Sequence, residues 1–66
     1  MRRNVKARMV KYIGWEHEIM EVEYVSGLIH QYKDVSEADY IRSLTGAIDK
    51  KVRRVGKTHA FIRVSE

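Results

Sequence analysis

The sequence contains no cysteine and no proline, and glycine occupies only four of its 66 positions. Without cysteine, neither a disulfide nor a thiolate metal site can reinforce the fold, and nothing indicates an oxidising compartment. No apolar run approaches the roughly 18–20 residues that a membrane-spanning helix requires. We therefore expect a cytoplasmic protein that makes no membrane contact.

The three histidines are too dispersed for a metal-binding motif, and no nucleophile has a histidine and an acid at a recognisable spacing. We therefore expect no cofactor and no enzymatic activity. The chain is expected to form a single domain, residues 1–66, with a thin core. A domain of this size buries only about 60% of the surface that its unfolded chain exposes.

The charges that are present fall into three blocks along the chain. Residues 1–15, 16–39 and 40–66 carry net charges of +5, −6 and +5, which give the overall charge of +4. A fold that places the two basic ends side by side would have one basic face and one acidic face. Such surfaces suit the binding of a charged partner better than catalysis in a cleft.

Alternating apolar and polar residues predict strands in the first half of the chain. We expect the first strand to begin at residues 5–9, with a bend or β-bulge near Met9, and a turn around residues 16–18. Residues 20–24 and 30–33 predict a hairpin with a three-residue loop at residues 26–28. This loop would pair Glu21 with Lys33 and would place one set of side chains on the same face: Met20, Val22, Tyr24, His30 and Tyr32.

Residues 36–39 predict the start of a short helix, with Ser36 as its N-cap and Asp39 at the third helical position. We expect this helix to close at Gly46 and to turn Ala38, Ile41 and Leu44 toward the core, with Tyr40 as a further candidate. Residues 50–55 and 58–64 then predict a second hairpin around Gly56. The sequence therefore predicts an α+β domain, a small antiparallel sheet with the order β-β-β-α-β-β and one short helix packed on it.

Part of this pattern resembles the KTSC family, short bacterial and phage domains also found at the C-terminus of some lysyl-tRNA synthetases. The resemblance covers about residues 10–47 and rests on Val10–Glu16, Met20 to Tyr24, Gly27, His30 to Tyr32, Asp34, Val35 and Tyr40. His30 stands where the family has the first tyrosine of a Tyr-x-Tyr motif, and Ser36 stands where it has proline. The resemblance implies a small RNA-associated module.

The basic residues near the C-terminus indicate contact with nucleic acid. Lysine and arginine release condensed counterions when they neutralise phosphates, and an exposed Phe61 would stack on an unpaired base. We therefore expect a non-catalytic module that binds nucleic acid, RNA rather than DNA. The predicted binding residues are Arg8, Lys51, Arg53, Arg54, Lys57, His59, Phe61 and Arg63. The alternative is that Phe61 belongs to the core and the charges are a solvated surface.

The acidic block supports a different function. Glu16, Glu18, Glu21 and Glu23, expected on a strand edge, would mimic phosphates or dock on a basic protein. The chain would then be a phage or prophage protein that inhibits a host protein machine, such as a defence nuclease complex or a polymerase. Charged strand edges also serve simply to prevent pairing between sheets. Edge strands and a thin core would equally allow a homodimer.

Overall fold

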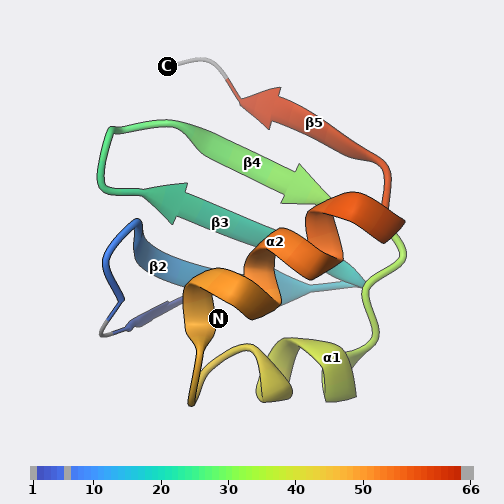
Figure 1. Ribbon diagram of the computed structural model, residues 1–66. Helices are drawn as coiled ribbons and strands as arrows, with labels where there is room; N and C mark the ends of the chain where they lie inside the picture. Colours follow the sequence, from blue (N-terminus) through green and yellow to red (C-terminus); the bar gives the residue numbers. More distant parts are fainter. Residues whose placement is uncertain (1, 6, 65–66) are drawn as a thin grey trace.

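The computed structural model describes residues 2–5 and 7–64 (Figure 1). It contains a five-stranded antiparallel sheet in which the strands follow one another in chain order: β1 (Arg2–Asn4), β2 (Val10–Glu16), β3 (Ile19–Tyr24), β4 (Ile29–Tyr32) and β5 (Phe61–Val64). Two helices, α1 (Glu37–Arg42) and α2 (Ile48–Thr58), connect β4 to β5. The α+β class is therefore confirmed. The detailed order differs, because four strands precede two helices and one strand follows them, whereas the sequence predicts three strands, one helix and two strands.

Both helices pack on the same face of the sheet (Figure 1). Ile13, Met20 and Val22 are fully buried there and form one core with Tyr40 of α1 and Val52 of α2. Because alternate residues of a strand point to opposite faces, Glu21 and Glu23 lie on the other side of β3. We call that side the open face, since no helix of residues 2–5 and 7–64 covers it.

The β2–β3 and β3–β4 hairpins follow from local turn chemistry. His17 and Glu18 both have positive φ (49° and 64°), as a two-residue β-turn between β2 and β3 requires. The next loop has the three residues that the alternation predicts, but it spans residues 25–27, and Gly27 closes it with φ +97°. The shared face is as predicted, whereas the register is shifted, so that Glu21 pairs with Gln31 and not with Lys33.

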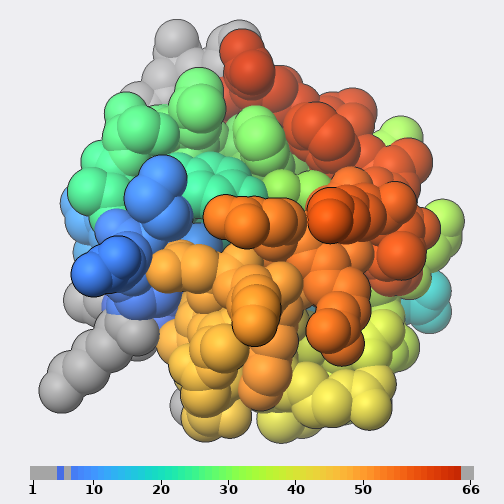
Figure 2. Space-filling view, viewed as in Figure 1, coloured from blue at the N-terminus to red at the C-terminus, as the bar shows by residue number. Residues whose placement is uncertain are grey.

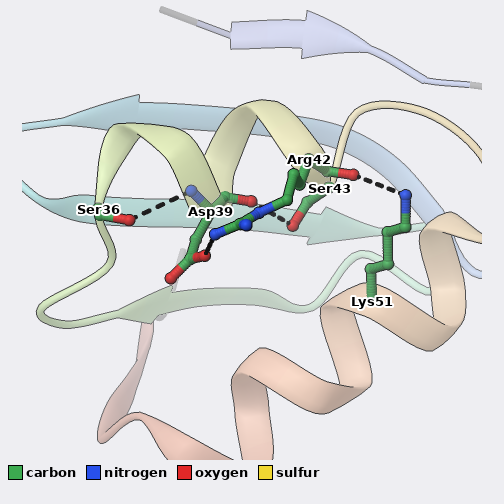
Figure 3. Close-up of polar contacts among 5 residues, drawn as sticks. All are labelled: Ser36, Asp39, Arg42, Ser43 and Lys51. Atoms are coloured by element: carbon green, nitrogen blue, oxygen red, sulfur yellow. Dashed lines mark hydrogen bonds and ion pairs between the residues drawn. The ribbon is translucent and has the colours of Figure 1, made fainter.

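Helix α1 begins where the sequence predicts it. The Ser36 hydroxyl accepts a hydrogen bond from the backbone N–H of Asp39 (3.2 Å), which satisfies one of the donors left free at a helix N-terminus (Figure 3). Of the residues expected to face the core, Tyr40 is buried and Leu44 packs against the core, whereas Ala38 and Ile41 are exposed, Ile41 by 56%, so the expectation is wrong for these two. Tyr40 stacks on Trp15 of β2, with 6.1 Å between ring centroids, and this contact sets the rotation of α1.

Residues 50–55 are helical, so the predicted second hairpin is wrong. Ile48, Val52 and Val55 are the buried residues of α2, and their spacing of four and three places them on one side of a helix. Gly56 lies within the last turns of this helix and not in a hairpin turn. No helix in the described part of the chain has the length and apolarity to span a bilayer.

The N-terminal segment differs from its prediction as well. The first strand is β1, whereas residues 7–9 bend toward α2 and Lys6 lies outside the described residues. The bulge expected near Met9 is present as a register shift between Val10 and Tyr12. Strands β1 and β5 form the two opposite edges of the sheet, so the expected adjacency of the first and last strands is wrong.

Candidate nucleic-acid interface

A basic surface nevertheless forms, because the segment before β2 reaches the start of α2. Asp49 accepts hydrogen bonds from the backbone N–H groups of Arg8 (3.1 Å) and Met9 (3.2 Å) through its two carboxylate oxygens. This contact places Arg8 beside the first turn of α2. Figure 2 shows the side chains of α2 across the middle of this face, with the N-terminal segment on one side and β5 on the other.

The exposed cations of α2 lie on two flanks of the helix. Lys50, Arg53 and Lys57 follow each other at spacings of three and four, which places them along one side. Arg8, Lys50 and Arg53 line a hollow of about 400 Å³ together with Asp49, which we call the basic hollow. Arg54 lies on the opposite flank, in a separate hollow against α1.

Another hollow, of about 350 Å³, lies between part of α2 and the sheet. Its sheet side consists of the rings of Tyr24, His30, Tyr32 and Phe61, and its helix side includes Arg53 and Lys57. We call it the aromatic groove. Phe61 is 47% exposed, so it does not belong to the core, and the sequence-based alternative that buries it is wrong.

The rings of the aromatic groove are held by contacts with one another. His30 packs against Phe61 at 4.7 Å and edge-on against Tyr24 at 5.2 Å between centroids. The hydroxyl groups of Tyr24 and Tyr32 lie 2.7 Å apart, and His30 Nδ1 lies 3.2 Å from the Tyr32 hydroxyl. These hydrogen bonds link three side chains from two strands into one polar network.

Two ionisable groups of this network are shifted toward their neutral forms. Burial and the hydrogen bond to Tyr32 raise the pKa of Tyr24 well above its ordinary value. Burial and the positive charge of Arg63 lower the pKa of His30. The floor of the groove is therefore uncharged at neutral pH, while its rim carries the charges of Arg53 and Lys57.

Two residues of the predicted site are engaged in structural contacts. The Lys51 ammonium donates hydrogen bonds to the backbone carbonyls of Arg42 (2.9 Å) and Thr45 (2.8 Å), which ties α2 to the end of α1 (Figure 3). His59 Nδ1 donates to the backbone carbonyl of Lys33 (2.9 Å) and joins the end of α2 to the end of β4. The contact with Arg42 satisfies a carbonyl group that helix α1 leaves unpaired at its C-terminus, and Thr45 lies in the loop that follows the helix.

Of the remaining predicted residues, four line the basic hollow or the aromatic groove, namely Arg8, Arg53, Lys57 and Phe61, whereas Arg54 lies on the other flank of α2. Arg63 is exposed on β5 and pairs with His30 across the strands, on the helix side of the sheet. The structure adds Lys50, Tyr24, His30 and Tyr32, which were not predicted as binding residues. Helical spacing would have indicated Lys50, but the aromatic members come from strands whose alternation marks them only as core.

The four glutamates do not lie on an edge strand, because β2 and β3 are both interior strands of the sheet. Glu16 and Glu18 are exposed at the turn between β2 and β3, whereas Glu21 and Glu23 are half-buried on the open face. Glu21 accepts a hydrogen bond from Gln31 on β4 (2.9 Å). Glu21 and Glu23 therefore do not serve to prevent pairing at an edge of the sheet.

No protein-family model matches the sequence, and no curated protein matches it. The resemblance to the KTSC family therefore rests on the residues of the chain alone. Within residues 2–5 and 7–64, no group of three or more histidine, aspartate or glutamate side chains is placed to hold a metal ion.

Proposed function

We propose that the protein is a non-catalytic module that binds nucleic acid, RNA rather than DNA, through the basic surface of α2. The observation that carries this proposal is the position of Arg53 and Lys57, which border a groove walled by aromatic rings. Cations beside exposed rings are the combination with which proteins bind single strands, through phosphates and unpaired bases. The KTSC resemblance supports the same class of ligand.

The phosphate contacts are assigned to the four cations that line the two hollows, namely Arg8, Lys50, Arg53 and Lys57. Arg63 is added to them because it is exposed and pairs across the strands with His30 of the aromatic groove. Lys51 and His59 are left out of this set because their polar atoms hold the fold together. Arg54 is left out because it lies on the other flank of α2. Single-stranded RNA is the expected ligand, since its unpaired bases are accessible to side chains.

A salt titration tests the proposal. Binding of a fluorescently labelled 12-nucleotide RNA is measured by anisotropy from about 50 mM to about 200 mM salt. Each neutralised phosphate should contribute about −0.7 to the slope of log K against log salt, so five contacts predict a slope of roughly −3.5. DNA of the same sequence should bind more weakly. Absence of binding at about 50 mM salt, or binding independent of salt, would contradict the proposal.

A charge-matched pair of variants locates the interface. R53Q should weaken binding and make the salt slope shallower by about 0.7, because one phosphate contact is lost. R54Q removes the same charge one residue away, on the flank that faces α1, and should leave the slope near the wild-type value. Equal effects of the two variants would indicate attraction by net charge alone and would contradict the assigned surface.

A second candidate function, docking on a basic partner protein, is favoured by the open face. Glu21 and Glu23 of β3 lie there, and Ile62 of β5, which is 49% exposed, lies on the same face across Gln31 of β4. A host protein machine with a basic surface would fit this combination, as an inhibitor of such a machine requires. Capture of one stoichiometric partner that survives nuclease treatment, and is lost in E21Q/E23Q, would support this second function over the first.

A further inference from the structure

The aromatic groove and the basic hollow adjoin each other along α2. Arg53 and Asp49 line both of them, so the two spaces share one wall. One space is walled by rings and the other by the cations Arg8, Lys50 and Arg53. This alternation of an aromatic and a cationic space matches the alternation of base and phosphate along a single strand.

The groove is large enough for one planar ligand and is already shaped for it. Its volume of about 350 Å³ lies at the lower end of the range of about 300–1,000 Å³ in which small-molecule sites fall. The ring of Phe61 packs on His30 and lies 5.4 Å from Tyr32, so it is supported from the sheet side while 47% of its surface stays exposed. A supported, exposed ring needs little ordering when a base stacks on it.

The charge of the site selects an anionic ligand over an apolar one. Arg53 and Lys57 are exposed at the groove, and Arg63 lies beside His30 on β5. The acid that lines both spaces, Asp49, already accepts hydrogen bonds from the backbone N–H groups of Arg8 and Met9. The uncompensated charge around the two spaces is therefore positive, which complements a phosphate group next to the stacked base.

We propose that the aromatic groove binds one unpaired base of a single strand, stacked on Phe61, and that the basic hollow binds the phosphate next to it. Arg53, at the shared wall, contacts that phosphate. This inference rests on the proposed nucleic-acid binding and adds a base site to it. The protein should therefore require an unpaired base, and it should discriminate against duplexes and against strands without bases.

The test compares two eight-nucleotide RNA strands with the same number of phosphates, one complete and one abasic at its four central positions. The wild-type protein should bind the complete strand more tightly by roughly 5- to 150-fold, the factor that corresponds to one base–aromatic stack. F61A should lose this difference and bind both strands as the wild type binds the abasic one. F61L keeps an apolar side chain on His30 and should show the same loss, which separates stacking from folding.

Ile62 provides the matched control. It follows Phe61 on the same strand, is equally exposed (49% against 47%) and lies on the open face. I62A should therefore leave the affinities for both strands unchanged. A loss in I62A equal to that in F61A would overturn the assigned groove, because it would reflect a general effect on β5.

A second readout uses the fact that Phe61 is the single phenylalanine of the chain. Protein labelled with 4-fluorophenylalanine gives one fluorine resonance, which should shift with the complete strand and not with the abasic strand.

If the wild type binds both strands equally and the resonance does not move, the base site is wrong while nucleic-acid binding stands. If neither strand binds at about 50 mM salt, the proposed function itself fails. Shifts caused by an acidic peptide but not by RNA would assign the groove to a protein ligand and overturn the inference.

Discussion

Gly56 of α2 lies directly against the ring of Tyr32, since a Cβ at position 56 would come within 3.3 Å of Tyr32 Cε1 and 3.5 Å of its hydroxyl oxygen. A glycine inside a helix normally lowers stability by about 1 kcal/mol relative to alanine. Here it permits close approach of the helix to β4. The Tyr32 ring is 4% exposed, and its hydroxyl group is hydrogen-bonded to Tyr24 and His30, so it has little freedom to move aside.

The substitution G56L should therefore lower the free energy of unfolding by about 1–3 kcal/mol, the usual effect of overpacking. Urea denaturation followed by the fluorescence of Trp15, the single tryptophan, measures this change. R54L places the same side chain at an exposed position of the same helix and should change stability by less than about 0.5 kcal/mol. Equal stability of G56L and the wild type would show that α2 does not depend on this contact.

The two hydrogen bonds of Asp49 are expected to hold the N-terminal segment on α2. D49A removes both acceptors for the N–H groups of Arg8 and Met9, together with an acid in the first turn of the helix, and should lower stability by about 1–2 kcal/mol. Amide hydrogen exchange at residues 8 and 9 should accelerate. Glu37 also lies in the first turn of a helix, so E37A is the control, and it should leave exchange at these two amides unchanged.

The Ser36 cap gives a third stability prediction. S36A removes the acceptor for the Asp39 N–H group and should lower the free energy of unfolding by about 1 kcal/mol. S36D supplies a carboxylate acceptor at the same place, also favoured by the helix macrodipole, and should retain most of the stability. Urea midpoints of the two variants measure the difference. A midpoint for S36A at the wild-type value would contradict the role of this cap.

The alternation of β3 and the start of α1 could be predicted because their signals are local. Met20 and Val22 alternate with glutamates along β3, and Ser36 precedes its helix with an acid three residues later. The register of the β3–β4 hairpin could not be predicted, since a three-residue loop centred on Ser26 and one centred on Gly27 place the same side chains on the same face. The structure has the loop centred on Ser26, because Gly27 then lies at the end of the loop, where the backbone adopts a positive φ.

The C-terminal helix was missed because its glycine was interpreted as a turn. In a strand, Arg54 would share the core-facing side with Val52, and Val55 would point to the other face. In a helix, Val52 and Val55 lie on one side together with Ile48. Gly56 is tolerated in α2 for a reason that lies in β4, and no local pattern shows it. The aromatic groove could not be predicted for the same reason, since Tyr24, His30 and Phe61 come together only when three strands pair.

The environment of His30 predicts a pH dependence of stability. Burial and the positive charge of Arg63 lower the pKa of His30 below its ordinary value of 6.5. From α2, the cations Arg53 and Lys57 and the acid Asp49 line the same groove. Of these charges, the cations oppose protonation of the ring, and the carboxylate of Asp49 is engaged by backbone N–H groups. A protonated His30 would therefore be destabilising in the folded chain.

Because the folded chain holds His30 at a lower pKa than the unfolded chain does, the unfolded chain binds more protons as the pH falls below about 6.5. The contribution of His30 to stability is therefore fully present above about pH 6.5 and is lost as the pH falls toward the folded-state pKa. H30F keeps an aromatic ring but cannot titrate, so its urea midpoint should fall less than that of the wild type between about pH 7.5 and about pH 5.5. Proton NMR of the His30 Cε1–H signal measures the pKa directly. A value at or above 6.5 in the folded protein would contradict this account, because the neutral floor of the aromatic groove depends on it.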